Sequence, residues 1–270
     1  MKTLKITSCM AENFEPYCGA IAAYLSEQLQ LSIEFVKDIP WQMREQQLDQ
    51  GEIQVGWICG FPYVCKADQV NPTIELLAAP VMRGDRYQGR PVYFSDVVVH
   101  RDSSFRSFAD LRGCTWAYNE PRSYSGCYVT RHHLATLGEY EGFFGKAIES
   151  GAHQTSLQWL LQRQIDASAI DSTVLELELQ HHPDIADQIR IIEILGIDGL
   201  GGSPIPPWVV STQVPQSIRS ELRQALLQMH QTAAGQAILQ PSPLDRFVAV
   251  TDRDYDPIRQ IAEPAEKVRL

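Results

Sequence analysis

The sequence predicts an α/β protein built from two lobes. At 270 residues the chain is long enough for about two lobes of ordinary size. Its first third alternates strand, helix, strand, helix and strand, an order typical of a mostly parallel sheet with flanking helices. Residues 199–207 are rich in Gly and Pro, which is typical of a segment that crosses between lobes. We therefore expect two lobes with a cleft between them, joined by two hinge crossings near Val92–Val99 and Ser203–Val210.

Strands are predicted where apolar residues alternate with polar ones or form short runs. In chain order these strands are Leu4–Cys9, Leu31–Val36, Ile53–Ile58, Ile74–Val81, Val92–Val99, Cys114–Ala117, Ile165–Ile170, Ile189–Leu195 and Trp208–Val210. The two crossings divide them into a first lobe of residues 1–95 and 206–270, which is discontinuous, and an inserted second lobe of residues 96–205. We expect mixed sheets with flanking helices in these lobes.

Helices are predicted where apolar residues recur at helical spacing. Pro16 stands at a plausible first helical position, and Gly51 ends a helix that begins at Trp41. Further helices are expected after Cys127, His153, Asp171 and Ser217, with a short last helix from Tyr255 onward.

Composition and charge exclude several classes of function. The chain has 33 acidic and 23 basic residues, so its net charge of -10 argues against nucleic-acid binding, which needs a basic surface. No apolar run approaches the ~20 residues that span a bilayer. The start of the sequence shows no signal peptide, so we expect a cytoplasmic protein unless an export signal has been removed, in which case it is periplasmic or membrane-associated. The six cysteines have no zinc-binding spacing, and we expect neither a metal nor a cofactor.

The stretch Tyr118–Gly126 is the strongest candidate for a functional site. It lies between a predicted strand and a predicted helix, and it holds two hydroxyls, Ser123 and Ser125, followed by Gly126. The first N–H groups of a helix have no intrahelical partners and carry the positive end of the helix dipole, so they favour a small oxyanion. The alternative is that Ser123 or Ser125 only caps the helix.

Several segments together resemble one known family, the phosphate/phosphite/phosphonate-binding proteins of ABC importers. The segment Phe108–Gly113 resembles the family's "SLADLRG" turn, and Ser123–Gly126 resembles its "STSG" anion loop. Ser150–His153 and Ala169–Ser172 resemble its "SGxH" and "AxDS" motifs. Each motif is short, and their order and spacing carry the resemblance, which runs through most of the chain.

The resemblance implies a type II periplasmic-binding-protein fold whose anion is held between the lobes by hydroxyls, amides, a His, an Asp and aromatic residues. It also implies a monomer that captures a small phosphorus oxyanion (phosphonate, phosphite or phosphate) and delivers it to an ABC transporter permease, without catalysis. Carried over by motif, the ligand-binding residues are Ser123, Tyr124, Ser125, Gly126, His153, Asp171, Tyr63 and Tyr17.

Each of these residue types suits anion binding, and each also has a structural alternative. The Ser123 and Ser125 hydroxyls and the His153 ring N–H would donate to oxyanion oxygens. As a lone His after a Gly, His153 could equally be a solvated residue at a helix start. Tyr17 and Tyr63 could add hydroxyl donors, or they could be core or rim aromatics.

Asp171 is the most informative residue, because an ionised carboxylate only accepts hydrogen bonds and would repel a fully ionised anion. It therefore favours a ligand that keeps a proton on oxygen or carries an amine, over sulfate. Its alternative role is the N-cap of the helix that begins at Ser172.

Two departures from the family pattern bear on function. Tyr124 stands where the family's loop has Thr, which removes a small hydroxyl and adds bulk, and the sequence shows no export signal. Two other classes therefore compete with the binding protein. One is a cytoplasmic sensor, and the other is a small-molecule enzyme in which His153 and Asp171 act as acid and base in an elimination or rearrangement.

Overall fold

A computed structural model describes residues 3–196 and 202–270. The chain divides into two compact units: unit 1 is Met1–Val92 with Pro204–Tyr255, and unit 2 is Tyr93–Ser203 with Asp256–Leu270. Two of the three passages between units fall at the predicted crossings. The third passage corrects the predicted boundaries, because residues 256–270, assigned to the first lobe, belong to unit 2. Gly199, Leu200 and Gly201 of the predicted second crossing lie outside the described residues.

Unit 1 is built on a six-stranded sheet in the order β13-β4-β12-β3-β1-β2. Its strands are β1 (Leu4–Ser8), β2 (Ile33–Val36), β3 (Val55–Trp57), β4 (Ile74–Met82), β12 (Trp208–Ser211) and β13 (Leu244–Val248). β1 runs parallel to β2 and β3, as the alternating sequence predicts, whereas β12 is antiparallel to β3 and β4, and β13 is antiparallel to β4. The sheet is therefore mixed. A separate ribbon pairs β5 (Val92–Tyr93) with β11 (Ser203–Pro204).

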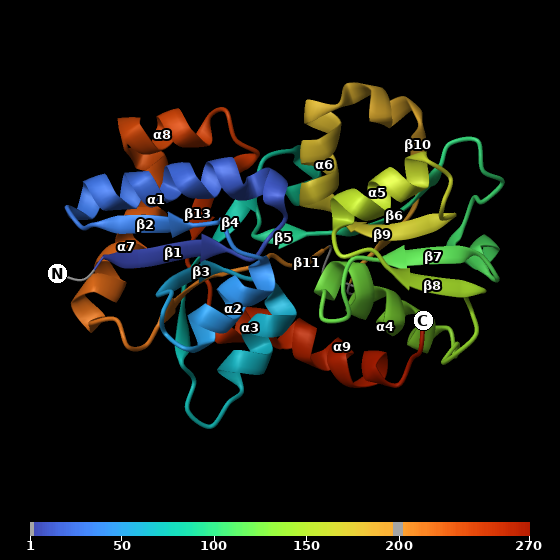
Figure 1. The fold of residues 1–270 in the computed structure, drawn as a ribbon, viewed down its shortest axis with the longest axis horizontal. Coiled ribbons are helices and arrows are strands. Elements are labelled where there is room, and N and C mark those ends of the chain that lie inside the picture. The colour runs from blue at the N-terminus through green and yellow to red at the C-terminus, as the bar shows by residue number, and fades with distance from the viewer. Residues whose placement is uncertain (1–2, 197–201) are drawn as a thin grey trace. The chain divides into compact units, whose positions relative to one another are not determined.

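The helices of unit 1 include the connections between its parallel strands. They are α1 (Glu15–Leu29), α2 (Trp41–Asp49), α3 (Gly60–Ala67), α7 (Gln216–Gln228) and α8 (Ala233–Leu239). The connection β1-α1-β2 runs one way along the sheet and β2-α2-β3 runs back, so right-handed crossovers place α1 and α2 on opposite sides. Figure 1 shows this arrangement.

The core of unit 1 is aromatic. Trp57 on β3 stacks on Trp208 on β12 with ring centroids 6.1 Å apart, and its indole nitrogen donates to the Pro206 carbonyl at 2.8 Å. Phe14 meets Trp57 edge to face at 5.2 Å. Both tryptophans are buried, so they pack in the core of unit 1.

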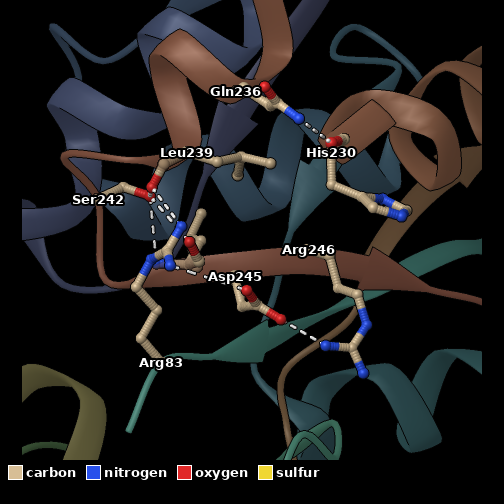
Figure 2. Close-up of polar contacts among 8 residues, drawn as sticks. Arg83, His230, Gln236, Leu239, Ser242, Asp245 and Arg246 are labelled. Atoms are coloured by element: carbon tan, nitrogen blue, oxygen red, sulfur yellow. Dashed lines mark hydrogen bonds and ion pairs between the residues drawn. The ribbon is translucent and has the colours of Figure 1, made fainter. Parts of the chain in front are cut away.

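Polar contacts fasten β13 to the end of β4 in unit 1 (Figure 2). Arg83, the residue after β4, donates to the Leu239 carbonyl at 3.2 Å and lies 3.8 Å from an Asp245 carboxylate oxygen. Asp245 also pairs with Arg246, whose other terminal nitrogen donates to the Gly89 carbonyl at 2.9 Å. This ion-pair group joins exposed or half-exposed side chains, so we assign it a modest structural role.

Unit 2 is built on a five-stranded sheet in the order β10-β6-β9-β7-β8. Its strands are β6 (Ser95–His100), β7 (Thr115–Tyr118), β8 (Lys146–Glu149), β9 (Ala167–Asp171) and β10 (Ile189–Leu195). β7 runs parallel to β8 and β9, whereas β6 runs antiparallel to β9 and β10. The carboxyl ends of β7, β8 and β9 therefore share one edge of the sheet.

Three α-helices of unit 2 come after the strands that end at that edge, and a fourth is formed by residues 256–266. They are α4 (Val129–Thr136), α5 (His153–Leu161), α6 (Ser172–His181) and α9 (Asp256–Glu266). A buried cluster that includes Val98, Leu160 and Ile170 joins α5 and α6 to the sheet. In α9, Ile258, Ile261 and Ala265 form a buried stripe, and α9 packs along α4 (Figure 1). This apolar stripe is the physical reason that the last segment belongs to unit 2.

Candidate functional site

The candidate site lies in unit 2, where three strands end and the helices that follow them begin. The loop after β7 carries Ser123–Gly126, the turn after β8 carries His153, and β9 ends at Asp171. These strands are parallel neighbours, so their carboxyl ends lie side by side at one sheet edge, where open α/β sheets bind ligands. Residues far apart in the sequence are thereby brought to one place.

The serine loop starts a helical segment that opens with one π-turn, Tyr124–Tyr128, and continues into α4. The Ser123 hydroxyl accepts a hydrogen bond from the Gly126 N–H at 3.1 Å, so the capping alternative holds for this residue. The Ser125 hydroxyl instead lies 3.4 Å from His153 Nε2. Ser95 on β6 fixes the position of the loop, because its hydroxyl donates a hydrogen bond to the Ser125 carbonyl at 2.6 Å.

Gly126 is where the loop is most crowded. A β-carbon built on this glycine would lie 1.9 Å from Asn119 Oδ1 and 3.1 Å from His153 Cε1. No larger residue fits without moving the backbone or both neighbours. The glycine is needed for close approach, which agrees with its predicted place in the loop.

His153 is the first residue of α5 and is 7% exposed, so the alternative of a solvated helix-start residue is wrong. Gly151, at a φ of 84°, makes the turn that brings it there. Burial lowers the pKa of His153 to about 4, so the ring is neutral at neutral pH. One ring nitrogen lies beside Ser125, and within the described residues the other, Nδ1, is buried without a hydrogen-bond partner. The imidazole can therefore make a further hydrogen bond through Nδ1.

Asp171 ends β9 and caps α6, as its structural alternative predicted. One carboxylate oxygen accepts from the Thr173 N–H at 2.8 Å and from the Thr173 hydroxyl at 2.6 Å. Burial raises the pKa of Asp171 to about 6, aided by the nearby Asp96 and opposed by the hydrogen bonds from Thr173 and Val174. In the β6–β9 ladder Asp171 stands opposite Ser95, which places it next to the serine loop.

The predicted tyrosines do not all join this group. Tyr124 belongs to the loop but is fully buried, with its ring 6.4 Å from that of Tyr93. Tyr63 and Tyr17 belong to unit 1. The Tyr63 hydroxyl donates to Asp252 at 2.8 Å, and Tyr17 is half-buried near Phe14. Ligand-binding roles for these three residues stay predictions.

Sequence reasoning missed two residues at this edge, Ser95 and Asn119. Ser95 supports the loop from a strand that is distant in the sequence, so no local pattern marks it. Asn119 directly follows β7, and its position just after a predicted strand was the available signal.

Among residues 3–196 and 202–270, no group of three or more His, Cys, Asp or Glu side chains could hold a metal ion. None of the helices in these ranges combines the length and apolarity needed to cross a bilayer.

Comparison with solved structures defines the class of the fold. A binding-protein component of an ABC phosphonate transporter from Pseudomonas aeruginosa superimposes with a TM-score of 0.82 at 17% identity, over 98% of this chain and 86% of that one. PhnD1 from Prochlorococcus marinus, solved in complex with methylphosphonate, gives 0.83 at 18% identity over 99% of both chains. A periplasmic binding protein of an arginine transport system from Legionella pneumophila gives 0.60 at 14% identity, over 90% of this chain and all of that one. The protein therefore has the two-lobed fold of type II periplasmic binding proteins.

The family is narrower than the fold. A family model described as "ABC transporter, phosphonate, periplasmic substrate-binding protein" matches residues 11–255. The chain belongs to this phosphonate-binding family, whose members are non-catalytic, periplasmic components of ABC transporters.

Proposed function

We propose that this chain captures a small phosphorus oxyanion at the sheet edge of unit 2 for uptake by an ABC permease. The observation that carries the proposal is the buried contact between the Ser125 hydroxyl and His153, 3.4 Å apart where parallel strands end. Methylphosphonate bound to the structurally similar PhnD1 supports a phosphonate as the first ligand to test. Phosphite and phosphate are the other candidates.

In this proposal the oxyanion is held by neutral donors. His153 is neutral at neutral pH because its pKa is lowered to about 4, so it contributes one N–H rather than a charge. The serine hydroxyls and the amides that open the helices supply the remaining donors. Asp171 accepts the proton that a phosphonate or phosphate monoanion keeps, and this disfavours sulfate.

Calorimetric titration of the wild-type chain tests the proposal. We expect heat of binding with at least one of methylphosphonate, 2-aminoethylphosphonate, phosphite and phosphate, and none with sulfate. Ser125→Ala should weaken binding by about tenfold or more, because it removes a buried donor to a charged group.

The matched control is Ser168→Ala. Ser168 on β9 is fully buried, and its hydroxyl has no hydrogen-bond partner in the described residues. The change should leave affinity unchanged. Equal affinity of wild type and Ser125→Ala would refute the site, and silence with all four phosphorus anions would refute the ligand class.

We also propose that the chain is a monomer and acts in the periplasm, where its family acts. Sedimentation equilibrium should give the mass of one chain, 30.4 kDa, with and without ligand. Stimulation of ATP hydrolysis by the cognate permease in vesicles, only when ligand-loaded binding protein is added on the periplasmic side, tests the transport role. A self-associating chain, or ATPase activity indifferent to the binding protein, would contradict these two statements.

A further inference from the structure

Asn119 is a polar side chain at the candidate site to which the proposed function assigns no role. It is the first residue after β7, and it lies between that strand and the serine loop. The residue is half-buried, but its side-chain oxygen, Oδ1, is fully buried. Within residues 3–196 and 202–270, no group donates a hydrogen bond to this oxygen. Leaving a buried acceptor unmatched costs stability, so the position is poorly explained by folding alone.

The position of Oδ1 points toward ligand binding. The β-carbon built on Gly126 would lie 1.9 Å from this oxygen, 3.0 Å from Asn119 Cγ and 3.1 Å from His153 Cε1. The carboxamide therefore lies against the glycine of the serine loop and shares that space with the imidazole. His153 Nδ1 is a second buried polar atom there without a partner in the described residues. Two unmatched polar atoms on side chains that approach the same glycine indicate a place that is completed by another molecule.

The chemistry of the surrounding groups indicates what that molecule must offer. The loop amides and serine hydroxyls can donate to an oxyanion, whereas Asn119 Oδ1 and the Asp171 carboxylate accept. Asp171 already accepts hydrogen bonds from Thr173, whereas Asn119 Oδ1 has no donor within the described residues. A ligand that only accepts hydrogen bonds would leave this oxygen unmatched, and a ligand with a donor beside its oxyanion would satisfy it.

We propose that Asn119 is a further ligand-contacting residue, whose Oδ1 selects phosphorus oxyanions that carry a hydrogen-bond donor next to the charged oxygens. This inference rests on the function proposed above. The donor is either the acidic P–OH of the ligand or an ammonium group on its substituent. Both present an N–H or O–H to the same acceptor.

The test is titration of wild type, Asn119→Ala and Asn119→Leu with methylphosphonate, which offers only P–OH, and with 2-aminoethylphosphonate, which also offers an ammonium. We expect both variants to bind about tenfold more weakly. Loss with both ligands identifies P–OH as the donor, and loss with 2-aminoethylphosphonate alone identifies the ammonium. Asn71→Ala, at an exposed asparagine of unit 1, is the matched control and should change neither affinity.

Thermal unfolding without ligand separates ligand contact from a structural role. Because Oδ1 has no donor, Asn119→Ala and Asn119→Leu should melt at or above the wild-type temperature while binding more weakly. Unchanged affinity in both variants would overturn the inference, and so would unfolding of both, which would show that the carboxamide supports the fold. If Ser125→Ala loses binding while both Asn119 variants keep it, the proposed function stands and this inference alone fails. If the wild type binds neither ligand, the proposed function fails first.

Discussion

The two buried titratable groups of the site, His153 and Asp171, should give the free energy of unfolding opposite pH dependences. Their pKa values are shifted in opposite senses by the same cause, burial away from water. Replacing one group should reveal the pH dependence of the other. The variants that do this with least change of shape are His153→Gln and Asp171→Asn.

For His153 the unfolded chain binds the proton more readily, because its ordinary pKa of 6.5 falls to about 4 in the folded state. The folded state therefore loses stability as the pH falls below about 6.5, and the loss is complete near pH 4. At about 1.4 kcal/mol for each pH unit between the two pKa values, the loss approaches about 3 kcal/mol.

For Asp171 the folded chain binds the proton more readily, because its ordinary pKa of 3.8 rises to about 6. Its contribution to stability is fully present below about pH 3.8 and is lost as the pH rises through about 6. The same conversion gives a loss of about 3 kcal/mol at neutral pH. Between about pH 4 and pH 6 the two groups therefore nearly cancel in the wild type.

Urea unfolding followed by tryptophan fluorescence, repeated at several pH values across this window, measures both effects. Subtracting each variant from the wild type cancels the other titrating groups. As the pH falls, the wild type should lose stability relative to His153→Gln and gain stability relative to Asp171→Asn. Two difference curves that are flat with pH, or that slope in the same direction, would refute the reasoning.

Three further predictions concern packing, charge and thiol reactivity. Gly126→Ala should lower the melting temperature and abolish ligand binding, since its methyl group would lie 1.9 Å from Asn119 Oδ1. The control is Gly19→Ala inside α1, where the nearest atom to the new methyl lies 3.5 Å away; this change should raise the free energy of unfolding by about 0.5–1 kcal/mol. Lys66→Met should cost about 3 kcal/mol in chemical denaturation, because it takes the buried cation away from the carboxylates of Glu45 and Asp49. Lys267→Met, at an exposed pair with Glu263, should leave the free energy of unfolding nearly unchanged. In the folded protein a thiol reagent should modify the exposed Cys65 first, and the buried thiols should react only when the protein unfolds. Mass spectrometry of samples taken over time can follow the modification. Equal rates of modification at all six cysteines would contradict this prediction.

Much of the fold could be predicted because most elements carry a clear local pattern. The alternating residues of β1 and the helical spacing that follows Pro16 predicted the parallel part of the unit 1 sheet. The antiparallel strand β13 and the edge strand β8 were missed, since the sequences Leu244–Val248 and Lys146–Glu149 mix charged and apolar residues over only four or five positions. A short edge strand depends on its neighbour for stability, which no single-sequence pattern contains.

The candidate site could be predicted in part for a related reason. Ser123, Ser125, His153 and Asp171 each mark a strand-to-helix junction, and parallel strands bring such junctions together. The burial of His153 was not predictable, because it depends on packing that the sequence around Gly151 does not show. Ser95 was not predictable either, since its role arises from a contact with the serine loop that no local pattern marks. Asn119 lies within the predicted stretch Tyr118–Gly126, but nothing in the sequence singled out its side chain.

The return of α9 to unit 2 has a consequence for how the protein is made. Unit 1 is incomplete until residues 204–255 have been synthesised, and unit 2 until residues 256–270 have followed. Domains usually fold one after another as the chain leaves the ribosome, the N-terminal one first. Here neither unit can do so early, because unit 1 needs residues 204–255 and unit 2 needs α9, which packs against α4. Both units are therefore expected to reach their native packing close together in time, after residues 204–270 have been synthesised.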